Sequence, residues 1–146
     1  MINCFENEYE FLSNFYEHPI TYNGIVYPTN EHFFQAMKTP VLSEHLEIAA
    51  AATPGRAKRL GRKATLWSDW EEIKEDVMLQ ALRLKFADPE LAEKLLATDG
   101  EYLIEGNWWH DNYWGVCSCE KCGHQGRNRL GELLMRVREE IKNAEN

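Results

Sequence analysis

The sequence predicts a helix-rich α+β fold, a single compact domain with a small antiparallel sheet. The chain has 146 residues, which suits one domain, and 44% of them are hydrophobic, enough to bury a core. Two short strand-forming runs come early, and several segments with helical periodicity follow them. Strands and helices do not alternate regularly, so a parallel α/β fold is not expected.

The strand-forming runs are Ile20–Tyr22 and Ile25–Tyr27, on either side of Asn23-Gly24. An Asn-Gly pair between such runs is a strong signal for a β-hairpin with a type I′ turn. We expect Pro28 to end the second strand, because its nitrogen has no proton to donate to a ladder.

Helices are expected after the hairpin, over residues 30–39, 43–52, 54–63, 69–86, 89–98 and 128–142. Thr29 or Asn30 can cap the first helix, and Thr53 precedes a proline at the first helical position of the third. Gly55 and Gly61 predict that this third helix is short or irregular.

The remaining part of the chain is expected to contain little regular structure. Tyr102–Glu105 is a candidate short strand, and the stretch 106–126, rich in Gly, Asn, Trp and Cys, is expected to be a loop. The final helix has an apolar stripe at helical spacing. Its members are Leu130, Leu133, Leu134, Val137 and Ile141.

Composition limits the functions that this chain can have. A net charge of −8 argues against broad non-specific binding to nucleic acid. No apolar run approaches the ~18 residues that a membrane span needs, so no membrane partner is expected. The N-terminal residues carry acids and lack the basic region of a signal peptide, so we expect a cytoplasmic protein.

A local basic cluster stands out in this acidic chain. It consists of Arg56, Lys58, Arg59, Arg62 and Lys63. Guanidinium and ammonium groups gathered in this way can select phosphate, and Arg56 and Arg59 are the candidate contacts. The alternative is a solvated helix face.

A polar stripe follows the first predicted helix. Glu31, Gln35 and Lys38 are spaced i, i+4, i+7 and so share one face. Glu31 also lies in the first turn, where the helix dipole favours a negative charge. A carboxylate and an amine on one rigid face could serve as a base and a group that binds an electrophile. The alternative is a polar face in contact with solvent.

Large aromatic side chains crowd the loop from Glu105 to Gly115. Trp114 could stack on a flat base, and Asp111 could orient a sugar hydroxyl or act as a second carboxylate. The alternative is a loop that its own aromatic residues hold in place. Further on, glycine and Asn128 precede the last helix, whose N-terminus could attract phosphate, although such helix starts are common.

Three of the four cysteines lie close together. Cys117, Cys119 and Cys122, with His124, supply enough ligands for tetrahedral zinc in a structural site. His110 or Cys4 could replace His124 as the fourth ligand. The spacing departs from the usual paired C-x2-C arrangement, and free thiols near the surface are the alternative.

Taken together, these segments resemble the YbiA-like, or NADAR, family. The matching stretches occur in the family's order and cover nearly the whole chain. They are Phe11–Phe15, Tyr27–His32, Gln35–Lys38, Val77-Met78, Lys85-Phe86, Asp111–Gly115 and Gly126–Arg138. The cysteine cluster departs from the family pattern, since YbiA-type members have a shorter glycine-containing segment there.

The resemblance implies a YbiA-like α+β domain over residues 1–146 that cleaves N-glycosidic bonds. Known family activities are hydrolysis of early phosphorylated intermediates of riboflavin biosynthesis and removal of ADP-ribose from guanine bases. The expected partner is therefore a small nucleotide or ribose-phosphate substrate, or an ADP-ribosylated nucleic acid. By motif, Glu31 matches the essential glutamate, Lys38 and Asp111 match polar pocket residues, and Trp114, Gly115 and Asn128 fall in the motifs that line the pocket.

These inferences combine into a hypothesis for the reaction. Glu31 transfers the proton that accompanies C–N cleavage, Lys38 stabilises charge or traps an opened sugar as a Schiff base, and Asp111 holds the ribose. Asn14 and the basic cluster help to hold phosphate. No cofactor is expected to be required for catalysis, and zinc would be structural.

Two other classes of function stay open from the sequence. The same pocket could bind ADP-ribose or NAD-like ligands without cleaving them. Alternatively, the cysteine cluster could be the working part, with zinc organising a surface for a protein partner.

Overall fold

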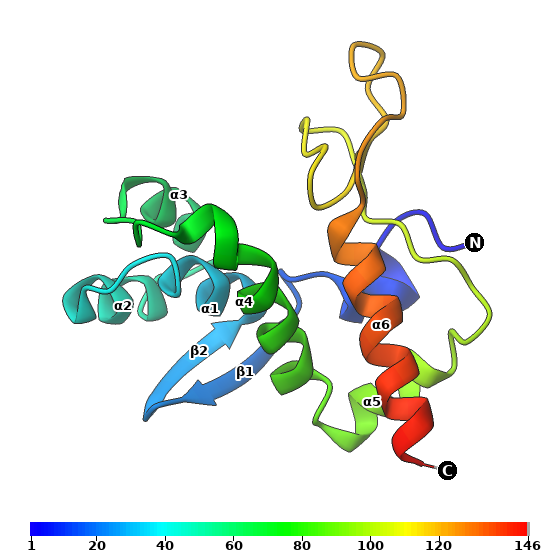
Figure 1. Ribbon diagram of the computed structural model, residues 1–146, viewed down its shortest axis with the longest axis horizontal. Helices are drawn as coiled ribbons and strands as arrows, with labels where there is room; N and C mark the ends of the chain where they lie inside the picture. Colours follow the sequence, from blue (N-terminus) through cyan, green and yellow to red (C-terminus); the bar gives the residue numbers. More distant parts are fainter. Residues whose placement is uncertain (146) are drawn as a thin grey trace. The chain divides into compact units, whose positions relative to one another are not determined.

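The structure is a computed structural model that describes residues 1–145. It contains two compact units, whose elements are labelled in Figure 1. The central unit comprises Asn14–Lys85, and the terminal unit comprises Met1–Ser13 together with the chain from Phe86 onward. The expected α+β class is confirmed, since helices predominate and the hairpin forms a small antiparallel sheet.

The hairpin opens the central unit. Strands β1 (Glu17–Tyr22) and β2 (Ile25–Thr29) pair antiparallel, with Ile20 opposite Tyr27. Asn23 and Gly24 have φ values of 51° and 78°, the left-handed conformations that a type I′ turn requires. The hairpin prediction is confirmed. The predicted end of the second strand at Pro28 is too early, because β2 continues through Pro28 to Thr29. Both strands of a two-stranded sheet are edge strands, and an edge strand tolerates proline.

Helices make up the rest of the central unit. They are α1 (Asn30–Ala36), α2 (Leu42–Ala49), α3 (Pro54–Lys63) and α4 (Trp70–Lys85). The hydroxyl of Thr29 accepts a hydrogen bond from the backbone N–H of His32, so the predicted cap of α1 is confirmed. Thr53 caps α3 in the same way, through the N–H of Arg56. The third helix was expected to be short or irregular; α3 is not irregular, because it is a continuous α-helix of 10 residues.

Helix α1 lies at the centre of this unit, where it contacts α2, α3, α4 and β2 (Figure 1). The Phe33 ring is fully buried and packs edge-to-face on Tyr22 and Tyr27, with centroids 5.5 Å away in each case. The buried core here consists of Tyr27, Phe33, Ala36, Ile48, Ala51, Ala57 and Ala81. This packing fixes the orientation of α1, and therefore the direction of its polar side chains.

The terminal unit begins with a 3-10 helix, η1 (Asn7–Leu12), which the sequence analysis did not predict. Its other elements are α5 (Pro89–Leu96), the two-residue strands β3 (Gly106–Asn107) and β4 (Val116–Cys117), and α6 (Arg129–Ala144). β3 and β4 pair in parallel within the stretch that was expected to be a loop.

The short strand predicted over Tyr102–Glu105 is reduced to one isolated bridge between Ile2 and Leu103. The carbonyl oxygen of Ile104, the next acceptor along this bridge, takes the N–H of Gly106 at 3.0 Å instead. On the other edge, the N–H of Glu105 donates to the side-chain oxygen of Asn128 at 3.0 Å.

The predicted apolar stripe of α6 faces the core of the terminal unit. Leu130, Leu133, Leu134 and Val137 are buried, and Ile141 is half-buried. Arg138 is also buried, and its Nη1 donates to the carbonyl oxygen of Thr98 at 2.9 Å. Within residues 1–145, no helix combines the length and the apolar character needed to cross a membrane.

Candidate active site

The predicted polar stripe on α1 is present and largely buried. Glu31 is 7% exposed, and its Oε1 accepts a hydrogen bond of 2.7 Å from Nε2 of Gln35, one turn further along the helix. The alternative of a solvent-facing polar stripe therefore does not hold for these two residues. A buried carboxylate held by a neutral donor is a suitable acid or base, because its direction is fixed and little water competes for it.

Lys38 lies just past the end of α1. Its ammonium group lies 5.8 Å from the ring centroid of Phe34, and its carbonyl oxygen accepts from the N–H of Trp67 at 2.9 Å. Burial lowers the pKa of Lys38, and the negative charge of Glu31 partly opposes this shift. A lower pKa increases the fraction of free amine, the form that can attack a carbonyl group.

The basic helix α3 acts electrostatically on Lys38, but through residues other than the predicted Arg56 and Arg59. The positive charges of Lys58 and Arg62 lower the pKa of Lys38 further, after the effects of burial and of Glu31. Arg56 and Arg59, exposed like Arg62, are not among the groups that shift this pKa. Lys58 and Arg62 are spaced i, i+4, so they lie on one face of α3. That spacing was available in the sequence, but nothing in the sequence indicated which face of α3 meets α1.

Gly61 explains how closely α3 approaches α1. A Cβ atom at Gly61 would lie 1.9 Å from Oε1 of Gln35 and 2.7 Å from its Cδ, closer than real Cβ contacts come. The Gln35 side chain thus fills the space that the missing Cβ leaves. Its Oε1 is buried without a hydrogen-bond partner, so packing against α3 holds this amide in place.

Asn14 holds the start of α1. Its carbonyl oxygen accepts from the N–H of Glu31 at 3.0 Å, and its side-chain oxygen accepts from Nδ2 of Asn30 at 3.4 Å. The side chain is 8% exposed, and its Nδ2 points to the sulfur of Met78, 3.5 Å away. These contacts give Asn14 a role in positioning the first turn that carries Glu31.

Lys85, at the end of α4, is a buried cation to which the sequence analysis assigned no role. It is 1% exposed, and its ammonium lies 5.5 Å from the ring centroid of Tyr16. Burial lowers its pKa from the ordinary 10.5 to about 7. The sequence contained a signal for this burial, because Lys85 falls at helical spacing from Met78 and Leu82, which are buried.

The terminal unit carries the other predicted residues, beginning with Asp111. One carboxylate oxygen of Asp111 accepts from the backbone N–H groups of Tyr113 and Trp114, at 3.1 and 2.9 Å. The side chain of Asn107 brackets Asp111, accepting from its N–H at 3.1 Å and donating to its carbonyl oxygen at 2.9 Å. The conformation of this loop is therefore set by polar contacts as well as by its aromatic residues.

Trp114 is half-buried, and its ring centroid lies 4.8 Å from that of Tyr113. Gly115 is buried, and a Cβ there would lie 1.8 Å from Oε2 of Glu105. Asn128 is 4% exposed and joins residues 103–105 to the start of α6, because its Nδ2 donates to the carbonyl oxygen of Leu103 at 2.8 Å. Glu105 is a further carboxylate in this region to which the sequence analysis gave no role.

The three clustered thiols meet a histidine, but not the one predicted. The ligand atoms of His110, Cys117, Cys119 and Cys122 all lie within 4.8 Å of one another, an arrangement that could hold a metal ion. Within residues 1–145, neither His124 nor Cys4 belongs to this group. Of the candidates for the fourth ligand that the sequence left open, the structure brings His110 to the thiols.

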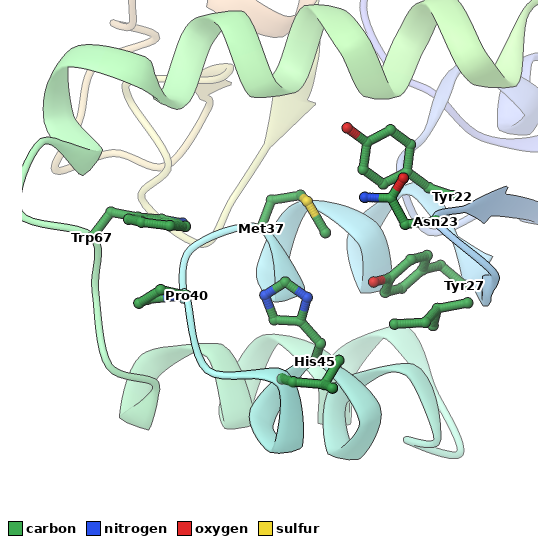
Figure 2. A pocket seen from close by; sticks show the side chains of 9 residues that line it. Tyr22, Asn23, Tyr27, Met37, Pro40, His45 and Trp67 are labelled. Carbon is green, nitrogen blue, oxygen red and sulfur yellow. The ribbon is translucent and has the colours of Figure 1, made fainter.

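A separate cavity of 360 Å³ lies in the central unit (Figure 2). Its lining consists of Tyr22, Asn23, Ile25, Tyr27, Met37, Pro40, Leu42, His45 and Trp67. Figure 2 shows the His45 ring between the two tyrosines and Trp67. Met37 and Glu31 point to different sides of α1 by helical spacing, and none of the predicted site residues lines this cavity.

Comparison with known proteins identifies the family. The NADAR domain matches residues 3–142. The chain belongs to the NADAR family. The resemblance stated above is therefore confirmed over almost the whole described sequence.

Named NADAR relatives are similar over most of this chain. N-glycosidase YbiA of Escherichia coli is 42% identical over 139 residues, which cover 92% of this chain and 83% of that protein. An N-glycosidase of Nostoc punctiforme is 40% identical, with 92% of this chain and 87% of that protein covered. A riboflavin biosynthesis protein of Vibrio vulnificus is 36% identical; 94% of this chain matches 37% of that longer protein.

A solved structure confirms the YbiA-like fold. The NMR structure of YbiA from Escherichia coli matches 99% of this chain and 89% of its own, with a TM-score of 0.84 and 38% identity.

Proposed function

We propose that this NADAR protein is an N-glycoside hydrolase that cleaves the C–N bond between a ribose, or a phosphoribose, and a base or amine. The observation that carries the proposal is the buried Glu31 carboxylate, held by Gln35 on α1. The names of its relatives support hydrolysis and give no support to a non-catalytic binding module. We also propose that residues 1–146 act as a single NADAR domain.

Glu31 is proposed to transfer the proton in this reaction. Water adds to the anomeric carbon, the C–N bond breaks, and one proton of the water ends on the departing nitrogen. Glu31 can take that proton from water or shuttle it at the ring oxygen, because its carboxylate is buried and fixed by Gln35. A group in this role typically contributes about 10²–10⁴-fold in rate.

Lys38 is proposed to act on the sugar. Its lowered pKa favours the amine, which can add to the aldehyde of an opened sugar and form a Schiff base with loss of water. When protonated, the same group can instead stabilise negative charge. Both roles require that Lys38 stays at the end of α1. The hydrogen bond from the N–H of Trp67 to the carbonyl oxygen of Lys38 helps to hold it there.

Phosphate is proposed to bind near the cations of α3. Lys58 and Arg62 already act electrostatically on Lys38, and an anion would relieve the repulsion among these three charges. Arg56 and Arg59 are exposed on the same helix and can attract a phosphate from solution. Asn14 contributes through the first turn of α1.

Two residues of the terminal unit are proposed as substrate contacts. Asp111 would hold the ribose, and Trp114 would stack on the base. Asp111 has one oxygen engaged with the backbone of its own turn, which fixes the direction of the carboxylate. Gly115 and Asn128 support this loop through backbone packing and hydrogen bonds.

The substrate class is proposed to be a small ribose-phosphate N-glycoside. The relatives named for riboflavin biosynthesis, from Vibrio vulnificus and Zea mays, support an aminated ribose phosphate of that pathway. The acidic net charge of −8 disfavours a general affinity for nucleic acid. ADP-ribosylated guanine is the second substrate that the test includes, because the NADAR family as a whole also contains that activity.

No cofactor is proposed for the catalytic step. We propose zinc as a structural ion at the cluster of three thiols and His110, since sulfur and imidazole are the ligands that zinc prefers. Unpaired thiols grouped in this way fit a reducing compartment, so we propose a cytoplasmic location.

The test is a turnover assay with matched variants. Wild type, Glu31→Gln and Glu72→Gln, an exposed carboxylate on α4, are given an aminated ribose phosphate and an ADP-ribosylated guanosine oligonucleotide. Release of base or amine and of sugar is followed by mass spectrometry, and circular dichroism verifies that each variant is folded.

We expect Glu31→Gln to lose at least about 100-fold in kcat, while Glu72→Gln keeps the wild-type rate. The preferred substrate then identifies the branch of the family. Full activity of Glu31→Gln would refute the assignment of Glu31. If wild type released nothing from either substrate but gained thermal stability with the ligand, the protein would be a binding module.

A further inference from the structure

The cluster of thiols contacts both chain neighbours of Asp111, His110 and Asn112. We propose that a thiophilic divalent ion of the zinc class, bound by the thiolates of Cys117, Cys119 and Cys122 and by Nδ1 of His110, fixes the loop 107–114 and thereby the direction of the Asp111 carboxylate. This inference rests on the structural zinc proposed above and adds the effect of the ion on the loop that carries Asp111.

The separations between the ligand atoms fit one tetrahedral ion. Nδ1 of His110 lies 3.4 Å from Sγ of Cys119, 3.4 Å from Sγ of Cys122 and 3.7 Å from Sγ of Cys117. Zinc bonds of about 2.3 Å to sulfur and about 2.0–2.1 Å to nitrogen, at a tetrahedral angle, place such atoms about 3.6 Å apart. The three nitrogen–sulfur separations therefore match those of a tetrahedral zinc site, and all four ligand atoms lie within 4.8 Å of one another.

The chemistry of the donors selects the ion. Three thiolates and one imidazole are soft or borderline ligands, which favour zinc over magnesium or calcium. Four protein ligands close the coordination sphere, so no open position is left for water or substrate, and the ion is structural. Cys117 is fully buried, Cys119 and Cys122 are half-buried, and His110 is exposed.

The backbone connects this cluster to Asp111 from both sides. His110 precedes Asp111, and the residue after it, Asn112, directs its Nδ2 at Sγ of Cys122, 3.6 Å away. Both neighbours of Asp111 are thus tied to the cluster. His110 has a φ of 71°, in the left-handed region that is uncommon outside glycine, and a bond to the ion would help to retain this conformation.

A second connection runs through Asn107, which brackets Asp111 by two hydrogen bonds. Asn107 is paired with Cys117 in the parallel strands β3 and β4, and its carbonyl oxygen accepts from the N–H of Ser118 at 2.7 Å. A metal ion bound to Cys117 therefore restrains Asn107, the residue that positions Asp111. Loss of the ion would release both connections together.

The experiment compares matched variants of the full chain. Wild type, His110→Ala, His124→Ala and Cys4→Ser are purified under reducing conditions, and bound metal is measured by mass spectrometry of the elements. Zinc affinity is measured by competition with a chelator, and cobalt is added to reveal the absorption bands of a tetrahedral thiolate site. Hydrogen exchange of peptides from 105–118 and from α1 is followed with and without zinc.

We expect one zinc per chain in wild type, His124→Ala and Cys4→Ser. In His110→Ala we expect zinc affinity to fall by more than the ~10–100-fold that loss of an outer-shell partner costs. Removing zinc should speed exchange in 105–118 at least about 10-fold and leave the peptides of α1 unchanged.

Each contrary result has a definite meaning. Failure of wild type to bind zinc or cobalt would overturn the site. Loss of metal in His124→Ala, with retention in His110→Ala, would overturn the assignment of His110. Zinc binding without any change in exchange over 105–118 would overturn the effect on the loop. These readouts need no substrate, so they are independent of the Glu31 assay that tests hydrolysis.

Discussion

Gln35 donates a hydrogen bond of 2.7 Å to the carboxylate of Glu31. The side chain of Gln35 also occupies the space where a Cβ atom of residue 61 would lie, which is free because that residue is Gly61. The helix that carries the proposed acid or base is thereby connected to the basic helix α3. Because α1 and α3 meet at this point, residues of α3 can influence Glu31 without touching it.

The first prediction concerns Gln35 as a positioning residue. Gln35→Leu removes the donor to Glu31, so the direction of the carboxylate is no longer held by this bond. We expect kcat to fall by about 10-fold or more while KM changes little. Steady-state kinetics give both quantities. An unchanged kcat would mean that the hydrogen bond from Gln35 does not position Glu31 for the reaction.

The second prediction compares two glycines on α3. Gly61→Ala places a Cβ against Gln35, so we expect a loss of about 1–3 kcal/mol in the free energy of unfolding, together with lower activity. Gly55→Ala is the matched control, because a Cβ there meets only the hydroxyl of Thr53 at 3.9 Å. It should be neutral or stabilising by up to about 1 kcal/mol. Urea unfolding measures both, and equal effects at the two positions would contradict the close packing of Gly61 on Gln35.

The third prediction compares a cation of α3 whose charge acts on Lys38 with one whose charge does not. Lys58→Ala removes a positive charge that lowers the pKa of Lys38, so this pKa should rise and the basic limb of the pH–rate profile should move upward. We also expect KM for a phosphorylated substrate to rise by about 10-fold, the cost of one charged contact. Arg56→Ala, an exposed change on the same helix, should raise KM less and leave the profile in place. A larger rise in KM for Arg56→Ala than for Lys58→Ala would show that Arg56, and not Lys58, contacts the phosphate.

The fourth prediction concerns the pH dependence of stability that Lys85 causes. Its pKa is lowered to about 7 by burial, while in the unfolded chain it returns to about 10.4. Between these values the unfolded chain binds a proton that the folded chain does not, so the free energy of unfolding rises with pH, by roughly 1 kcal/mol per unit. The penalty for the buried charge is fully present below about pH 7.

Lys85→Met should therefore flatten this rise and make the protein more stable near pH 6. Lys38 has a shift of the same direction, so part of the slope should remain. Urea unfolding of both proteins at several pH values between 6 and 9 measures the two slopes. Parallel curves for the two proteins would show that Lys85 is charged in the folded state throughout this range.

Local signals in the sequence were sufficient for much of the fold. The turn at Asn23-Gly24 and the caps at Thr29 and Thr53 depend on backbone conformations and hydrogen bonds only a few residues apart. Glu31 and Gln35 could be placed on one face of a helix for the same reason, because helical spacing is a local property. The sequence could not show that residues 102–105 form only one bridge, because the side chain of Asn128, far along the chain, hydrogen-bonds to the backbone of Leu103 and Glu105.

The sequence by itself thus determined the α+β class, the hairpin, the helices and the set of side chains suited to the proposed chemistry. Only the tertiary structure decided which members of that set meet. It placed Lys58 and Arg62, rather than Arg56 and Arg59, where their charges act on Lys38, and it brought His110 rather than His124 to the three thiols. The physical reason is that helical periodicity and capping depend on neighbours in the chain, whereas burial, pKa and ligand geometry depend on groups that only packing brings together.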